Sequence, residues 1–237
     1  VLFPGLFAAV NRGKKSIALN LKDNTDRAAF LRLARRADVV IEGYRPGVTA
    51  RLGIDYPTLS ALNPGLVYCS VSGYGQTGPY RDRPGFARIG HAVGGLTHLS
   101  GLPGQIPVTP GSTSLGDYMS GMYGVIGIMM ALRHRDATGQ GQVIDMALYE
   151  SVFRVLDEIA PRYALEGYIR EPEGTGTVNA CPHGHFQTGD GKYMAIACTT
   201  DKMFERLCAA MKRPDLHKRY GAQAVRLANR DIVIREV

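Results

Sequence analysis

The sequence predicts an α/β fold, in which a large domain with a mostly parallel sheet is followed by a smaller α+β domain. Two patterns support this prediction. Short segments rich in β-formers alternate with segments of helical spacing through the first half of the 237 residues. A polar, glycine-rich stretch at 166–180 then precedes a hairpin pattern and a further helix. We therefore expect a large domain over 1–165, a linker over 166–180 and the start of a small domain over 181–237.

The expected elements of the first part alternate between strand and helix. Residues 16–21 (SIALNL) alternate apolar with small or polar residues, which is typical of a strand. The elements that follow are, in order, a helix that Asn24 or Thr25 caps and that runs to Ala37, a short buried strand at 39–41, a helix at 57–62 and a strand at 65–72.

The middle of the chain contains two loops and two helices. Residues 73–84 are rich in Gly, Gln, Thr, Pro and Arg, so we expect a long exposed loop of the kind that carries function. The segments that follow are a helix at 86–99, a loop at 103–114 and a long apolar helix at 118–135. Within this last helix, Gly121, Gly124 and Gly127 recur every third residue and should let another backbone pack closely.

The last part returns to the alternating pattern and then changes. Its expected elements are a turn at 138–141, a strand at 142–146, a helix at 148–164, a hairpin at 186–198 that turns at 189–192, and a helix at 201–211. The chain begins with Val1 and ends inside an amphipathic pattern at 222–237 that has no cap or glycine. We therefore expect a fragment of a longer protein.

Composition limits the partners of the protein. A net charge of +7 favours an anionic partner, but zinc-finger and RNA-recognition signatures are absent, so we expect a small polyanion rather than nucleic acid. The four cysteines are scattered, and Cys181, His183 and His185 lack further ligands nearby, so we expect neither disulfides nor a metal site. The longest apolar run, 118–132, is shorter than the roughly 20 residues that a bilayer requires. We expect a cytoplasmic protein without a membrane partner.

Five motifs, in this order along the chain, resemble the family III CoA-transferases of the CaiB/BaiF type. They are Asn11–Lys22, Ala37–Gly47, Ser72–Pro79, Leu115–Asp117 and Thr138–Gln142. This family includes formyl-CoA transferase, carnitine CoA-transferase and α-methylacyl-CoA racemase, and the resemblance extends from about Phe7 to Leu216. It implies an interlocked homodimer and a large CoA-binding and catalytic domain whose N-terminal part is missing here. It also implies that acyl-CoA and a small carboxylate are the substrates, with no permanently bound cofactor.

The resemblance implies that Asp117 attacks the acyl-CoA thioester and forms an aspartyl anhydride. An aspartyl thioester intermediate then follows the anhydride. The chemistry is reasonable, because covalent catalysis divides the transfer into steps that each keep the acyl group activated. Unpaired N–H groups at the start of a helix would also keep this carboxylate ionised. From the residues alone, a helix cap is the alternative role for Asp117.

Four residues match family positions that contact CoA. Lys22 and Arg51 match phosphate-binding positions, Leu19 matches a position beside the adenine, and Tyr44 matches an aromatic residue near the nucleotide. Ammonium and guanidinium groups suit the phosphates of CoA. Gly43 departs from the family pattern, since some members carry Asn there.

His91 leaves a second activity open. In the racemase branch a histidine and the aspartate that matches Asp117 exchange the α-proton of the acyl group. His91 is therefore a candidate for proton transfer, for the substrate pocket or for a purely structural role. A non-catalytic anion-binding module is the alternative of another class. The acyl group is not identified, but a dicarboxylate such as succinate suits a basic pocket.

Overall fold

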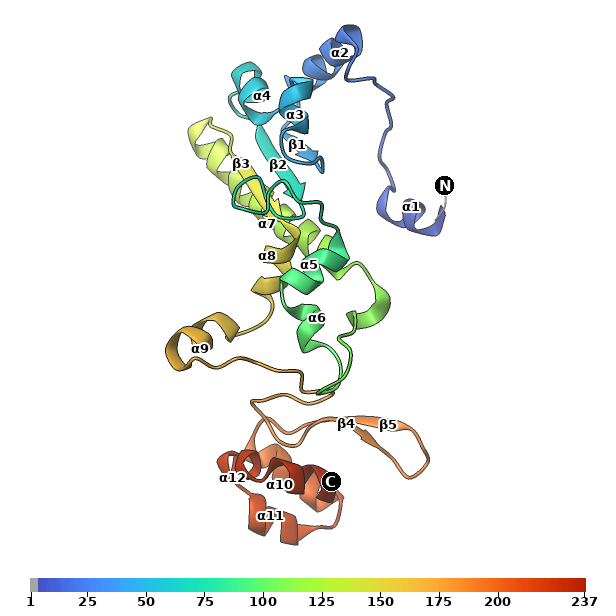
Figure 1. Ribbon diagram of the computed structural model, residues 1–237, viewed down its shortest axis with the longest axis vertical. Coiled ribbons are helices and arrows are strands. Elements are labelled where there is room, and N and C mark those ends of the chain that lie inside the picture. Colours follow the sequence, from blue (N-terminus) through green and yellow to red (C-terminus); the bar gives the residue numbers. More distant parts are fainter. Residues whose placement is uncertain (1–3) are drawn as a thin grey trace. The chain divides into compact units, whose positions relative to one another are not determined.

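The computed structural model describes residues 4–237, which form two compact units (Figure 1). The first unit combines the chain up to Phe86 with Asp117–Ser151, and the second combines Ala87–Gly116 with Val152–Val237. The fold is of the mixed α/β class, as the sequence predicts. The contiguous domain boundaries expected from the sequence, with a linker at 166–180, stay a prediction about the intact protein.

A three-stranded parallel sheet organises the first unit. Its strands are β1 (Val39–Glu42), β2 (Val67–Ser72) and β3 (Val143–Ala147), in the order β1-β2-β3. The first four residues of β2 are buried, because this strand has a neighbour on each side. The strand expected at 39–41 is present as β1, but the expectation that it is buried is wrong, because within residues 4–237 it is an edge strand whose Ile41 is 63% exposed.

Helices precede β1 and connect it to β2. α1 (Pro4–Val10) and α2 (Asn24–Ala34) come before β1, and α3 (Val48–Leu52) and α4 (Tyr56–Leu62) lie between β1 and β2. Asp23, rather than Asn24 or Thr25, caps α2, since its carboxylate accepts the backbone N–H of Thr25 at 2.8 Å. A small core of Ala34, Leu59, Leu66 and Tyr68 joins α2 and α4 to the sheet.

The strand expected at 16–21 is absent, and this segment forms no regular element. Ile17 is 65% exposed, so the alternating pattern does not bury one face. A strand is stable only beside a partner, and no strand among residues 4–237 pairs with this segment.

The long helix α7 (Leu115–Thr138) packs on the sheet (Figure 1). A Cβ at Gly124 would lie 3.9 Å from the Cys69 sulfur, and one at Gly127 would lie 3.4 Å from Ile144. These two glycines therefore admit side chains of β2 and β3, whereas Gly121 faces open space. The glycine stripe thus brings helix and sheet together over part of its length.

The length of α7 corrects one expectation. This helix has 24 residues and a mean hydropathy of 1.2 in its most apolar window, so by length and composition it is able to cross a membrane. A single such helix is a weak indication, because core helices of soluble proteins meet the same criteria. Only 28% of that window is buried.

Two helices expected to be continuous are broken. The segment 86–99 divides into α5 (Ala87–Val93) and α6 (Leu96–Leu99), and Gly95 between them has φ 93°. The segment 148–164 divides into α8 (Leu148–Arg154) and α9 (Ile159–Glu166). Pro161 explains the second break, since it has no N–H for the carbonyl of Asp157 and its ring would clash with that group. A short 3-10 helix, η1 (Pro110–Ser112), lies in the loop before α7.

The C-terminal part of the second unit has its own core. The antiparallel hairpin of β4 (His183–Gln187) and β5 (Tyr193–Ala197) confirms the expected hairpin. It is followed by α10 (Asp201–Ala210), α11 (Pro214–Tyr220), α12 (Gln223–Ala228) and α13 (Arg230–Glu236). The core side chains are Cys181, Cys198, Phe204, Cys208, Leu216 and Val233. The guanidinium of Arg226 is fully buried and donates to the carbonyl of Cys181 at 2.6 Å and to Asp201 at 2.9 Å.

Candidate active site

Asp117 is the third residue of α7, so its carboxylate lies in the first turn, as expected. At this position it meets the positive end of the helix dipole, which favours the charged carboxylate. Asp117 lines a cavity of about 300 Å³ in the first unit. The cavity is lined by Gly43, Tyr44, Arg45, Pro46, Val71, Ser72, Gly73, Arg81, Arg83, Pro84, Gly85, Phe86, Asp117 and Leu148. These residues come from the segment that follows β1, the end of β2 and the loop after it, and the starts of α7 and α8.

Three arginines, Arg45, Arg81 and Arg83, line this cavity together with the single carboxylate of Asp117, so its charge is positive. Arg81 lies 3.5 Å from Asp82, but both side chains are exposed and such a pair is weak. Within residues 4–237, Arg45 and Arg83 have no carboxylate within salt-bridge distance. The cavity therefore offers two unneutralised guanidinium groups to an anionic ligand.

The loop between β2 and α5 forms one wall of the cavity, and its two ends touch. A Cβ on Gly73 would lie 2.7 Å from the Cα of Gly85, so this approach requires glycine. The carboxylate of Asp145 on β3 accepts the backbone N–H of Gln76 at 2.8 and 3.0 Å from its two oxygens. The loop is therefore closed at its base and tied to the sheet.

Aromatic rings support the outer part of the same loop. The guanidinium of Arg83 lies over the ring of Tyr80, 4.1 Å from the centroid. Tyr80 meets Tyr74 edge to face at 5.6 Å, and Tyr74 lies 6.1 Å from Tyr149 on α8. Burial raises the pKa of the Tyr149 phenol above its ordinary value. This row of rings restricts the positions open to Arg83.

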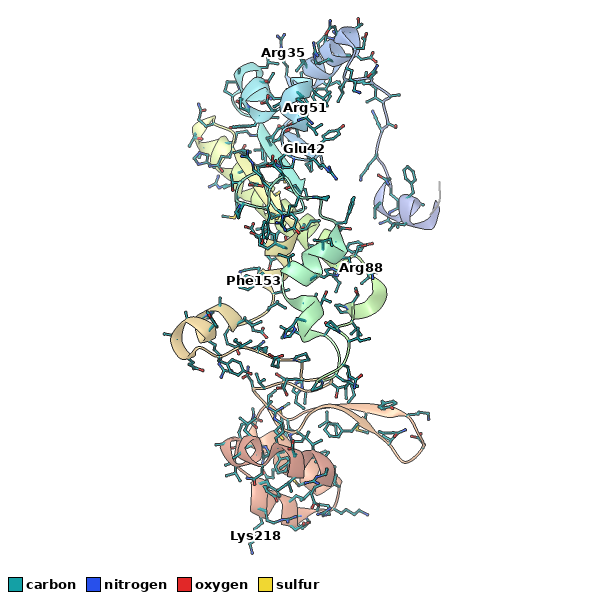
Figure 2. All side chains as sticks on the ribbon, viewed as in Figure 1. Arg35, Glu42, Arg51, Arg88, Phe153 and Lys218 are labelled. Carbon is teal, nitrogen blue, oxygen red and sulfur yellow. The ribbon has the colours of Figure 1, made fainter. Side chains whose placement is uncertain are left out.

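A second cavity of about 410 Å³ lies beside β1, and Tyr44 lines both cavities. Its lining is largely apolar and includes Leu21, Phe30, Ile54 and Tyr68. Glu42 at the end of β1 holds the backbone between the two cavities, since its carboxylate accepts the Tyr44 N–H at 2.7 Å and the hydroxyl of Ser70. Figure 2 labels Glu42 on β1.

The other expected CoA ligands lie elsewhere in the first unit. Leu19 is half-buried and Lys22 is exposed in the irregular segment before α2, while Arg51 is exposed in the last turn of α3 (Figure 2). None of these three lines either cavity. The structure thus brings Tyr44 to the cavity of Asp117 but not Leu19, Lys22 or Arg51.

Sequence reasoning missed the three arginines of the cavity. Arg45 directly follows Tyr44 in one of the family motifs, and Arg81 and Arg83 belong to the loop that composition marked as functional. The sequence signal that could have identified them is an arginine directly after a strand or in a glycine-rich loop, where a guanidinium can bind an anionic ligand. Only the fold brings the two segments to one cavity.

His91 is buried in the second unit, with 1% of its surface exposed. Its Nε2 accepts the backbone N–H of Gly116 at 2.8 Å. This hydrogen bond uses the lone pair of Nε2, so a neutral ring carries its proton on Nδ1. His91 therefore positions the residue that precedes Asp117.

The expectation of no metal site concerns Cys181, His183 and His185. Cys181 belongs to the buried core, and burial raises the pKa of its thiol. Among residues 4–237, no three His, Cys, Asp or Glu side chains are grouped so that they could hold a metal ion.

Comparison with known proteins identifies the family. Residues 4–237 match CoA-transferase family III. The chain is 56% identical over 224 residues to the succinyl-CoA–L-malate CoA-transferase alpha subunit of Chloroflexus aurantiacus, covering 94% of this chain and 52% of that protein. It is 36% identical over 239 residues to the succinyl-CoA:mesaconate CoA-transferase of Haloarcula marismortui, covering 99% and 60%. The chain thus spans about half the length of the curated relatives it matches.

Solved structures agree with this assignment. The crystal structure of a CaiB/BaiF family protein from Brucella suis shares 36% identity and a TM-score of 0.78, over 94% of this chain and 59% of that one. The crystal structure of Rv3272 from Mycobacterium tuberculosis shares 30% identity and a TM-score of 0.83, over 95% and 59%. Sequence and fold together show that the chain belongs to CoA-transferase family III.

Proposed function

We propose that the intact protein transfers CoA from an acyl-CoA thioester to a carboxylic acid, with Asp117 as the nucleophile. The observation that carries this proposal is a carboxylate in the first turn of α7 that lines a small cavity with three guanidinium groups. A cavity of about 300 Å³ is at the lower limit of small-molecule sites. It suits an acyl group and the thioester rather than the whole coenzyme.

The covalent steps follow from carboxylate and thioester chemistry. A carboxylate oxygen of Asp117 attacks the acyl carbonyl, and the carbon–sulfur bond breaks to give an aspartyl anhydride and CoA thiolate. The thiolate then attacks the aspartyl carbonyl and releases the first acid, which leaves an aspartyl-CoA thioester. The acceptor carboxylate repeats these two steps in reverse order. Guanidinium groups in the cavity stabilise the negative charge that develops on the carbonyl oxygen.

The nucleotide end of CoA would lie outside this cavity. Tyr44 lines both the cavity of Asp117 and the larger apolar cavity beside β1, which suits a ligand that extends from one to the other. Lys22 and Arg51 are exposed in the same unit and would bind phosphates. Leu19 would contact the adenine, as the family resemblance implies.

Dicarboxylic acids are the substrate class that we infer. The relatives are named for succinyl-CoA with L-malate or mesaconate, and each of these acids has two carboxylates. In the described part of the chain, two guanidinium groups of the cavity have no carboxylate partner, which supports a substrate with a second negative charge.

For the intact protein we infer a homodimer of interlocked subunits in the cytoplasm. The α7 helix presents an apolar face, and Met130 on it is 70% exposed, which favours a further layer of protein over this helix. The apolar face consists of Tyr118, Met122, Val125, Ile126, Met129 and Met130. All four cysteines are free and buried, which suits a reducing compartment.

The racemase alternative needs a base at His91. Nε2 of His91 already accepts the N–H of Gly116, so its lone pair is not available for a substrate proton without breaking that bond. The geometry therefore favours transfer over racemisation.

Intact mass spectrometry tests the proposal. The full-length protein should gain the mass of a CoA adduct when incubated with succinyl-CoA, and hydroxylamine should convert the adduct to a hydroxamate at Asp117. Asp117→Asn should abolish the adduct and the transfer, because an amide is a poor nucleophile. Asp136→Asn, at the exposed far end of the same helix, is the matched control. Transfer that survives in Asp117→Asn would refute the assignment.

A further inference from the structure

We propose that Arg83 binds the remote carboxylate of a dicarboxylic acyl group and so selects dicarboxylic over monocarboxylic substrates. This inference rests on the proposed transferase function, since it concerns the acyl group that Asp117 would attack. The two residues line the same cavity, Asp117 from the start of α7 and Arg83 from the loop after β2.

The charge of the cavity is the first argument. Three guanidinium groups and one carboxylate line it, so an acyl group without a charge would leave more than one cation unneutralised. A dicarboxylic acyl group carries a free carboxylate at the end opposite the thioester. Pairing that carboxylate with a guanidinium offsets the cost of removing both from water.

The orientation of Arg83 is the second argument. Its guanidinium carbon lies over the Tyr80 ring, 4.1 Å from the centroid, which is a cation–π contact. This contact holds the guanidinium at one place in the cavity lining without occupying its N–H donors in a hydrogen bond to the ring. The planar guanidinium can therefore still donate two parallel hydrogen bonds to one carboxylate.

The rigidity of the loop is the third argument. Gly73 and Gly85 close its base, and Asp145 accepts the N–H of Gln76. Tyr80 is itself supported by Tyr74. A preorganised cation loses little entropy when it binds, which is the requirement for discrimination between similar ligands.

The other two arginines are less suited to this role. Arg81 lies 3.5 Å from the carboxylate of Asp82, which competes, though weakly, with a substrate carboxylate for its guanidinium. Arg45 belongs to the segment of Tyr44, a residue that lines both cavities, so a contact of Arg45 with the coenzyme is the role that we assign to it. The alternative for Arg83 is a contact with a CoA phosphate, and this alternative predicts a different outcome below.

The test compares two acyl donors of equal chain length, succinyl-CoA and butyryl-CoA. At the end remote from the thioester, the succinyl group has a carboxylate and the butyryl group has a methyl group. In a two-step transfer through a covalent enzyme, kcat/KM for the donor reports only the half-reaction with that donor. Arg83→Gln should lower kcat/KM for succinyl-CoA about 10- to 100-fold, the usual effect of losing a charge-assisted hydrogen bond. Butyryl-CoA should change less than about twofold, because it has no group for Arg83 to bind.

Two further variants control for folding and charge. Arg83→Lys keeps the charge but not the two parallel donors, so it should restore part of the lost rate with succinyl-CoA. Arg35→Gln removes the same charge from an exposed position at the end of α2, outside the cavity (Figure 2), and should leave both donors unchanged. Thermal unfolding of each variant shows whether the fold is retained.

Binding of free CoA provides a readout that does not depend on turnover. Because CoA has no remote carboxylate, Arg83→Gln should leave its dissociation constant unchanged. Weaker CoA binding, or an equal loss with both donors, would refute the inference and indicate a phosphate contact. If the wild-type protein forms no adduct with any acyl-CoA, the proposed function fails instead. If wild-type transfer depends on Asp117 but Arg83→Gln loses equal activity with both donors, only the role of Arg83 is refuted.

Discussion

The carboxylate of Asp145 accepts the backbone N–H of Gln76, at 2.8 and 3.0 Å from its two oxygens, across 69 residues of sequence. Asp145 lies on β3, and Gln76 lies in the loop that follows β2. The parallel pairing of β2 with β3 brings the two residues together. The sheet thus sets the position of the loop that carries Arg81 and Arg83.

Asp145→Ala should loosen this loop without unfolding the protein. The variant leaves the Gln76 N–H without its charged acceptor, and hydrogen bonds to charged groups contribute about 1.5–3 kcal/mol. Amide hydrogen exchange in residues 73–86 should become faster, and kcat/KM for an acyl-CoA should fall about tenfold. Asp136→Ala, whose carboxylate is exposed, is the control. Unchanged exchange in the loop would show that Asp145 does not hold it.

Gly73→Ala should destabilise the base of the same loop. Its Cβ would lie 2.7 Å from the Cα of Gly85, and neither backbone has room to move without opening the loop. We expect a loss of about 2 kcal/mol in the free energy of unfolding, measured by urea denaturation.

The matched control is Gly189→Ala, at the hairpin turn, where an added Cβ meets nothing within 4 Å. The stability of this variant should stay within about 0.5 kcal/mol of wild type. Equal stabilities for the two variants would contradict the close approach of Gly73 and Gly85.

His91→Ala should reduce the stability of the protein. The substitution removes a buried side chain and leaves the Gly116 N–H without its acceptor, which together should cost about 3 kcal/mol. His185→Ala, at an exposed position of β4, should have little effect on stability.

Isotope exchange separates the transferase from the racemase alternative. In heavy water the wild-type protein should introduce no deuterium at the α-carbon of the acyl group. Deuterium that appears with wild type and disappears with His91→Ala would favour the racemase alternative.

Tyr68 should make stability depend on alkaline pH. Burial, with a smaller effect of the Glu42 carboxylate, raises the pKa of its phenol from 10.0 to about 12. The unfolded chain therefore releases this proton at a lower pH than the folded protein. The stabilisation is complete below pH 10 and is lost as the pH rises toward 12, by about 3 kcal/mol in all.

Urea midpoints between pH 9 and pH 12 measure this effect. Tyr68→Phe should lose less stability over that interval than wild type, whereas Tyr193→Phe, which changes a 72% exposed side chain, should behave as wild type. Part of the dependence should persist in Tyr68→Phe, because burial also raises the pKa of the four thiols. Identical pH profiles for wild type and Tyr68→Phe would show that the phenol is not responsible.

Local sequence determined most of the regular elements of this protein. Periodicity and turn residues, which act over a few positions, predict the strands near 39–41, 65–72 and 142–146, the long helix α7 and the hairpin after Cys181. The place of Asp117 in the first turn of a helix was predictable for the same reason. The family motifs are also local, so the family is recognisable from those short stretches alone.

Tertiary structure decided which residues meet. The segment 16–21 has the pattern of a strand but no partner among the described strands, so pattern alone could not form it. Arg45, Arg83 and Asp117 belong to three separate segments, and parallel strands bring them to one cavity because the ends of neighbouring strands lie at the same edge of a sheet. Such convergence depends on the pairing of distant strands, and no short stretch of sequence contains that information.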